Sequence, residues 1–319
     1  VIYMTNISNL SQPTQRLIQQ YQLWNQSMLP KTGTPTIHVD EVASAVASFY
    51  EKIRGVVDWK EEHLFRKAAI ERALKRRLLM QKTGEEAAEP FVFELIRGGH
   101  FPNDRIEEAK ISEVKDVLDK YIFIIENNTQ SKNEEPDINL YNWILGLAAC
   151  EIEEILCPCL KEKALIEYMA ESMREAIRVK ENKMAGKKLT EEEKNVQIYI
   201  ACQRALFKLD KSTISYYLLR NKYPNWSGLS DFQLREATLN IFSIWNNIEK
   251  ELNHSLADKF YKICERADTA FLILGDILSQ KSGETQKILA DPPLLENLIR
   301  QAYQKRLSKL KGRLSRAAL

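Results

Sequence analysis

Apolar residues recur along most of this chain at intervals of three and four positions, the spacing that places them on one face of an α-helix. The two clearest rows predict one helix each, over residues 237–252 and 256–278. Nearly every apolar pattern has this period, and not the period of two that a half-buried strand requires. The pattern therefore predicts an all-α fold, a multi-helix array or bundle with more than about 65% helix and no three-stranded sheet.

Capping signals divide this pattern into separate helices. Pro90 is expected to open a helix that ends at Gly98 and Gly99, and Pro292 to begin the last one. The predicted N-caps are Asp40, Asp137, Thr190 (with Glu193 in a capping box) and Ser230 (with Gln233 in a second box).

Polar stretches mark the boundaries between larger segments. Residues 1–39 carry only two charges and form a polar N-terminal segment with one short helix around Leu17, Tyr21 and Trp24. The run 128–136 is polar, ends in proline and is interpreted as a linker. It separates two helical subdomains, residues 40–127 and 137–290, and residues 291–319 form a basic amphipathic C-terminal helix.

The composition indicates a folded chain but does not indicate a particular function. Hydrophobic residues make up 44% of the 319 residues, enough for a buried core, and the net charge of only +2 removes any global argument for a nucleic-acid partner. The apolar, uncharged run 138–150 is shorter than the roughly 20 residues that cross a bilayer, and no signal-peptide pattern is present. Because the chain starts at Val1 and stops at Leu319 inside a helical pattern, we expect it to be a piece of a longer protein.

Cysteine and histidine spacing gives no metal or redox motif. The odd number of cysteines, five, favours a reducing compartment over a disulfide framework. Cys150 and Cys157 would lie about 10 Å apart on one helix, too far for direct bridging, and Cys159 has no histidine nearby. No zinc-protease, nucleophile-elbow or phosphate-loop motif is present in the sequence. We therefore expect no metal, cofactor or disulfide, with Cys202 and Cys264 as small core residues beside aliphatic neighbours.

Two basic segments are candidate surfaces. Residues 60–82 include Arg72, Lys75, Arg76 and Arg77, but as a helix they would spread bases around the whole circumference. This favours a solvated helix with ion-paired neighbours over a phosphate-binding face. We accordingly expect exchanging Arg76 and Arg77 for Gln to alter stability by under about 0.5 kcal/mol.

The second basic segment is the C-terminal helix. Residues 300–319 carry seven Lys and Arg and no acid. One arc of this helix is apolar, namely Ile299, Tyr303, Leu307, Leu310, Leu314 and Ala317, and another is basic, namely Lys305, Arg306, Lys309, Arg313 and Arg316. Such a helix can pack on its own domain, pair with another chain, lie on an anionic bilayer or follow nucleic acid.

The run Val39–Leu78 (VDEVASAVASFYEKIRGVVDWKEEHLFRKAAIERALKRRL) resembles helical N-terminal regions of large, uncharacterised bacterial proteins that are membrane-anchored. It is a helix pattern without a chemical motif, so no functional residue carries over. The resemblance implies that membrane segments follow further along and that the basic C-terminal helix is cytoplasmic and next to a membrane.

Two functions therefore compete. The first is a non-catalytic helical interaction or scaffold region of a longer protein, cytoplasmic and at the inner face of a membrane, with a protein partner or an anionic membrane surface. The alternative is a nucleic-acid-binding helical module that uses Arg72–Arg77 and the C-terminal basic helix, which requires both segments on one surface. A helical enzyme whose acids and bases meet only in the fold ranks last, because nothing in the sequence selects its carboxylates.

Overall fold

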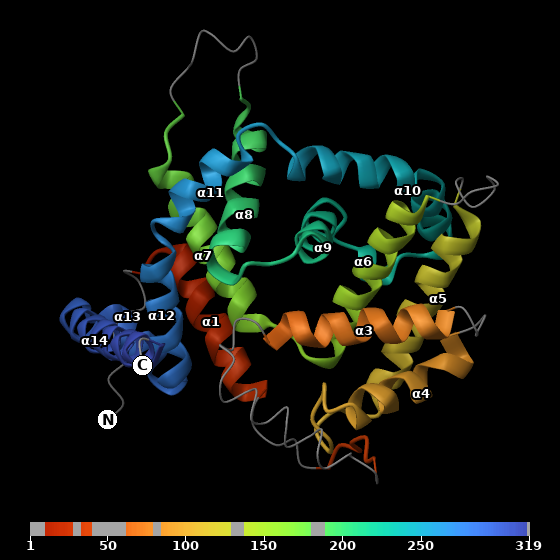
Figure 1. Cartoon of the computed structure of the whole chain (residues 1–319), viewed down its shortest axis with the longest axis horizontal. Coiled ribbons are helices and arrows are strands. Elements are labelled where there is room, and N and C mark those ends of the chain that lie inside the picture. Colours follow the sequence, from red (N-terminus) through yellow and green to blue (C-terminus); the bar gives the residue numbers. More distant parts are fainter. Residues whose placement is uncertain are drawn as a thin grey trace. The chain divides into compact units, whose positions relative to one another are not determined.

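Figure 1 shows the computed structural model of the chain, which is built from α-helices. The structure describes residues 10–27, 33–39, 62–78, 84–128, 137–179 and 189–317. This part of the chain is 81% helical and contains thirteen α-helices and no strand. A single isolated bridge joins Thr36 to Glu107. The all-α fold is confirmed.

The bounds of the described elements are as follows. In chain order they are α1 (Gln12–Ser27), α3 (Glu62–Leu78), α4 (Gly84–Arg97), α5 (Ala109–Asn127), α6 (Ile138–Leu156), α7 (Leu160–Ala176), α8 (Glu191–Phe207), α9 (Lys211–Lys222), η3 (Trp226–Gly228), α10 (Asp231–Leu252), α11 (Ala257–Glu265), α12 (Asp268–Gln280), η4 (Ser282–Glu284), α13 (Thr285–Ala290) and α14 (Pro292–Ala317).

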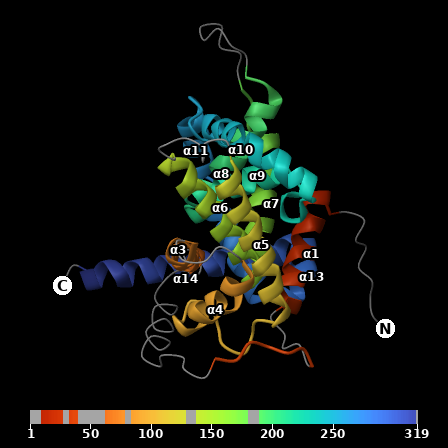
Figure 2. The ribbon, with the colours of Figure 1, turned by 90° about the vertical axis from the view of Figure 1, so that its right-hand side faces the viewer.

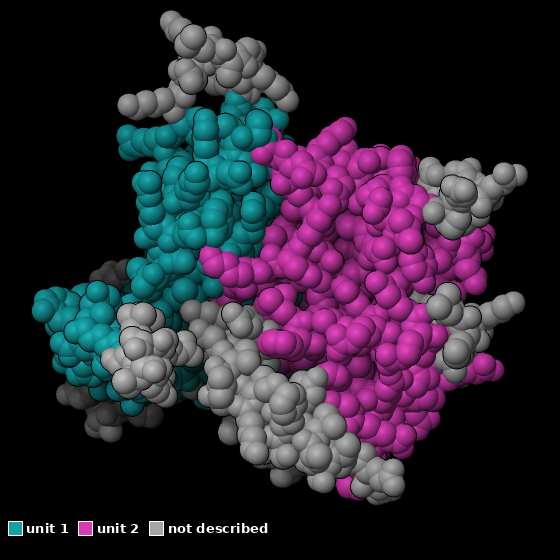
Figure 3. Space-filling view, viewed as in Figure 1, with its two compact units in different colours: residues 1–30, 159–206, 255–319 teal, residues 31–158, 207–254 magenta. Residues whose placement is uncertain are grey.

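The chain divides into two compact units, coloured separately in Figure 3. Unit 1 comprises residues 1–30, 159–206 and 255–319, and unit 2 comprises residues 31–158 and 207–254. Each unit therefore interleaves segments that are distant in sequence, whereas the sequence analysis expected contiguous subdomains. The proposed linker, 128–136, lies outside the described residues except for Asn128, and so does the helix expected after Asp40.

Unit 1 is organised around the contact of α1 with α7 and α12. Leu17 and Tyr21 of α1 are buried in one cluster with Ala164 and Leu278. Gly275 permits this close packing, because a Cβ there would lie 2.9 Å from a Leu165 methyl carbon and 3.2 Å from the Tyr21 hydroxyl. Aromatic spacing in residues 17–24 therefore identified a real core helix.

Unit 2 is organised around α6. Thirteen of its 19 residues are buried, and the helix contacts α3, α5 and α9. Its N-terminus is fixed as predicted, since the Asp137 carboxylate accepts hydrogen bonds from the backbone N–H groups of Asn139 and Leu140. A helix buried on most of its circumference must place any charged residue against a partner.

A closed hydrogen-bonded network satisfies the most buried of these charges, on Glu151. Lys120 on α5 donates to both Glu151 carboxylate oxygens at 2.6 and 2.8 Å and to the Trp226 carbonyl at 3.1 Å. Tyr121 donates its hydroxyl proton to the same carboxylate at 2.8 Å, and the Trp226 indole N–H donates to Tyr121 at 2.9 Å. The network ties α5, α6 and η3 together.

The remaining predicted helix ends agree with the structure in most places. Both capping boxes are present: Thr190 exchanges hydrogen bonds with Glu193, and Ser230 with Gln233. The glycine stop after α4 is a Schellman turn, with Gly99 at φ +71° and the His100 N–H bonded to the Leu95 carbonyl.

Two helix boundaries were predicted wrongly. The helix expected to open at Pro90 begins six residues earlier, at Gly84, because the Asp119 carboxylate accepts the Gly84 N–H at 2.7 Å and caps it from α5. The single helix expected over residues 256–278 is two helices, α11 and α12. A tight turn separates them, in which the Ala267 N–H bonds to the Cys264 carbonyl three residues back.

We predict that Lys120→Met destabilises the fold by about 3–5 kcal/mol, because it leaves the Glu151 carboxylate buried without its cation. The control is Arg300→Met, which breaks the exposed Arg300–Glu296 pair on α14 and should cost under about 0.5 kcal/mol. Urea unfolding of both variants measures the two losses. A Lys120→Met loss as small as that of the control would contradict the structural role of the network.

Candidate functional site

The C-terminal helix α14 forms the main candidate surface, and its start is fixed locally. The Asp291 carboxylate accepts the Leu294 N–H at 3.1 Å, while the Asp291 carbonyl accepts the Leu295 N–H at 3.0 Å. Pro292 and Pro293 occupy the first helical positions, where a missing N–H costs nothing. The helix spans Pro292–Ala317, and Figure 2 shows its second half side-on.

The first half of α14 packs on α12 and α13. Leu294, Leu295, Leu298 and Ala302 of α14 cover a buried cluster, and that cluster consists of Ile273, Ile277 and Ile288. The contact ends in an ion pair between Arg306 and Asp276 of α12, with the Arg306 Nε 3.1 Å from the carboxylate. One of the five bases of the predicted surface is therefore engaged within unit 1.

Beyond this contact, α14 exposes an apolar row. Ile299, Tyr303 and Leu307 follow one another at intervals of four and are 36%, 55% and 40% exposed. At about 100° per residue, the row begins four positions after the packed Leu295 and turns progressively away from Leu298 and Ala302. The row therefore remains uncovered by unit 1 while the same helix is anchored to it.

Among the predicted bases of α14, Lys305 is exposed, but it lies about 160° around the helix from Tyr303 and Leu307, on the opposite side from the row. The side chains of Lys309, Arg313 and Arg316 lie outside the described part of the structure, as do those of Leu310, Leu314 and Ala317. By helical periodicity, positions 306, 309, 313 and 316 continue the face that Leu298 and Ala302 use for packing. That face changes from apolar to basic after Ala302, where the Arg306–Asp276 ion pair takes over the contact with α12.

The second predicted surface, on α3, is partly neutralised. Arg72, Lys75 and Arg76 are exposed, but Arg76 and Arg77 both bind the Glu94 carboxylate of α4. The Arg77 side chain is only 23% exposed, and its guanidinium donates to Glu94 at 2.8 and 3.0 Å and to the Pro90 carbonyl at 3.1 Å. Arg77 is therefore a structural clamp between α3 and α4, and not part of a solvated face.

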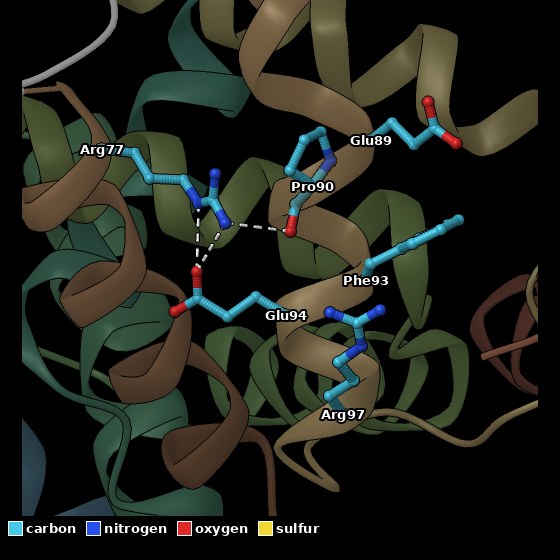
Figure 4. A pocket seen from close by; sticks show the side chains of 6 residues that line it. All are labelled: Arg77, Glu89, Pro90, Phe93, Glu94 and Arg97. Carbon is cyan, nitrogen blue, oxygen red and sulfur yellow. Dashed lines mark hydrogen bonds and ion pairs between the residues drawn. The ribbon is translucent and has the colours of Figure 1, made fainter. Parts of the chain in front are cut away.

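A shallow groove of about 350 Å³ lies beside this clamp. Figure 4 shows its lining: Arg77, Glu89, Pro90, Phe93, Glu94 and Arg97. The Arg77–Glu94 ion pair forms one wall, while the Arg97 side chain lies on the Phe93 side of Glu94. Sequence reasoning did not identify Glu94 or Arg97, because the pairing depends on how α3 and α4 meet, and no spacing within one helix signals it.

Burial raises the pKa of Glu94, but hydrogen bonds and charge from Arg76 and Arg77 outweigh it and lower the pKa on balance. The clamp thus holds an ionised carboxylate between two guanidinium groups. A groove whose most buried cation is already paired offers little free positive charge to a phosphate chain.

The described cysteines and acidic residues provide no metal-binding cluster. All five cysteines are free thiols in the structure. In the described ranges, no group of three or more His, Cys, Asp or Glu residues could hold a metal ion. None of the described helices is long and apolar enough to cross a bilayer.

No family model, curated protein or solved structure was found to match this chain.

We predict that Arg77→Gln costs about 1–2 kcal/mol of stability, since it removes charge-assisted hydrogen bonds from a half-buried clamp. Arg76 lies on the same helix and binds the same carboxylate, but its side chain is more exposed. Arg76→Gln should therefore cost under about 0.5 kcal/mol of stability. Urea denaturation compares the matched pair. Equal losses would show that the two arginines are equivalent.

The clamp also predicts a pH dependence. Because the folded-state pKa of Glu94 is lowered, its stabilisation is fully present above the ordinary carboxyl pKa and is lost as pH falls through the folded value. The stability difference between wild type and Glu94→Gln should therefore be largest at neutral pH and shrink on acidification. Denaturation midpoints between pH 7 and pH 3 (roughly the carboxyl range) measure it, with Glu86→Gln on the exposed side of α4 as control.

Proposed function

We propose that this chain is a non-catalytic helical interaction region of a longer protein, and that the second half of α14 docks it on an anionic membrane surface. The observation that carries the proposal is the exposed row Ile299, Tyr303 and Leu307 on a helix that unit 1 holds by its first half. The proposed setting is the cytoplasmic, inner face of a membrane.

The row suits an interfacial membrane anchor. Its apolar side chains would enter the boundary between headgroups and acyl chains, and removing their apolar area from water would favour binding. By helical periodicity, Lys311 falls on one side of the row, beside the Glu296-paired Arg300, and position 313 falls on the other, beside the Asp276-paired Arg306. Cations on both flanks suit an anionic surface, where each adds up to about 1 kcal/mol near the headgroups.

Charge also argues against the two other occupants of this surface. Residues 300–319 contain no acid, so two copies of α14 would bring like charges together along a coiled coil. A protein partner would need to supply a complementary acidic groove. An anionic bilayer supplies an apolar layer for the exposed row and negative charge for the basic residues beside it. It therefore needs no binding groove shaped to fit α14.

The nucleic-acid alternative draws less support from the structure. It relies on Arg72, Lys75, Arg76 and Arg77, and two of these four are held by Glu94. The apolar row on α14 would also remain unused by a phosphate backbone, which offers only charge and polar contacts.

The test is co-sedimentation of the whole chain with vesicles. We expect binding to vesicles that contain about 30% phosphatidylserine, weaker binding to pure phosphatidylcholine, and a decrease with added salt. Leu307→Glu should lower the partition at least about tenfold, because it replaces an inserted apolar side chain by an acid. The matched control is Leu239→Glu, at a residue that is 61% exposed on α10.

Equal binding to both vesicle types, no binding to either, or equal losses from Leu307→Glu and Leu239→Glu would each reject membrane docking by α14. A short RNA or DNA duplex that displaces the chain from vesicles, equally well for the wild type and for Leu307→Glu, would favour the nucleic-acid alternative.

A further inference from the structure

Two cysteines that the sequence analysis treated as unconnected core residues touch each other in unit 1. Cys202 on α8 and Cys264 on α11 are 62 positions apart in sequence, and their Sγ atoms are 3.9 Å apart. Both residues are fully buried, at 0% exposure. The expectation that both cysteines are buried is confirmed. Each thiol also has the other as a neighbour, and the Cys202 S–H is placed to donate a hydrogen bond to the Cys264 sulfur.

Neighbouring contacts hold the two helices in this register. Arg204, two positions after Cys202, lies over the Tyr261 ring of α11 at 5.1 Å from its centroid. Its guanidinium is also 4.0 Å from the Asp258 carboxylate of α11. These two contacts join α8 to α11 beside the thiol pair, so the approach of the two sulfurs is a feature of the helix pairing.

The electrostatic surroundings make the two thiols unequal. The hydrogen bond to Cys264 and burial raise the pKa of Cys202, and the positive charge of Arg174 on α7, whose buried Nε has no hydrogen-bond partner among the described residues, opposes this rise. The hydrogen bond from Cys202 lowers the pKa of Cys264, although burial opposes this shift. The thiolate of the pair is therefore favoured on Cys264, the sulfur that accepts the hydrogen bond.

Cys150 provides the contrast within the same chain. It is a buried thiol of α6 whose Sγ lies 3.7 Å from the Thr213 hydroxyl, and burial raises its pKa strongly despite a nearby lysine. It faces no second sulfur in the described structure, and so has no partner with which to close a disulfide. Burial alone therefore does not distinguish the Cys202–Cys264 pair, whereas the facing thiols do.

We propose that Cys202 and Cys264 are a thiol–disulfide switch that hydrogen peroxide closes and a dithiol reductant opens. The Cys264 thiolate attacks the peroxide, forming an S–O bond as the O–O bond breaks and hydroxide leaves to take up a proton. The Cys202 sulfur then attacks the sulfenic acid, so the S–S bond forms, the S–O bond breaks and water leaves. In total, two thiols and one peroxide give one disulfide and two waters.

Peroxide reaches the pair through local opening of α11. This helix has only nine residues and is bounded by the turn at Leu256 and by the break at Arg266–Ala267. Short helices with breaks at both ends open at lower free-energy cost than the core around them. The resulting disulfide joins α8 to α11 and closes a 62-residue loop, which restricts the unfolded chain and stabilises unit 1.

The test is a thiol count and a peptide map of the whole chain after treatment with hydrogen peroxide. We expect two of the five thiols to disappear, with recovery on dithiothreitol, and a disulfide-linked peptide pair containing Cys202 and Cys264. The linked form should unfold roughly 5 °C or more above the reduced form. A Cys157→Ser, Cys159→Ser double variant should lose the same two thiols.

A further pair of variants tests the role of charge. Arg174→Gln should slow disulfide closure about threefold, because the positive charge of Arg174 acts on Cys202, the sulfur that attacks the sulfenic acid. Arg178→Gln removes an exposed arginine four positions on and should leave the rate unchanged. Because the map is made on the wild-type chain, the result does not depend on whether cysteine variants fold.

Five thiols remaining after peroxide treatment, a disulfide mapped to Cys157 and Cys159 instead, or a mapped pair that only joins separate chains would each overturn the proposal. Equal rates for Arg174→Gln and Arg178→Gln would remove the assigned role of Arg174.

Discussion

Unit 2 depends on how α6 buries charge. The helix is enclosed by α3, α5 and α9, yet it carries Glu151 and Glu153 at 2% and 6% exposure. Each carboxylate meets a cation from a different neighbour: Lys120 of α5 binds Glu151, and Arg66 of α3 lies 3.1 Å from Glu153. Apolar packing alone would tolerate sliding of one helix past another, whereas these pairs are satisfied in one register only. The arrangement of the neighbouring helices follows from that register.

How far the sequence predicts this fold depends on whether a signal is local. The Asp137 cap, the two capping boxes and the glycine stop at Gly99 were predictable, because each motif is complete within a few residues. The start of α4 was not, since its cap, Asp119, comes from another helix. The break between α11 and α12 carries no proline or glycine, so an unbroken apolar row concealed it.

The candidate surfaces show the same division. The amphipathic character of α14 follows from the spacing of its own residues. The exposed row of Ile299, Tyr303 and Leu307 is the first half of the predicted apolar arc. Which face packs was not predictable, because this depends on the cluster that α12 and α13 present. The clamp of Arg76 and Arg77 on Glu94, and the meeting of Cys202 with Cys264, join residues whose separation in sequence carries no information about contact.

The interleaving of the two units has a consequence for how the chain folds during synthesis. The core that holds α1 includes Leu278, so Leu17 and Tyr21 have no complete site to pack in until more than 250 further residues have been made. At roughly 5–20 residues per second, that interval lasts on the order of ten seconds or more. During it, α7 emerges first and can cover only part of the apolar face of α1. Unit 1 can therefore complete its core only late, after the segments of unit 2 have emerged from the ribosome.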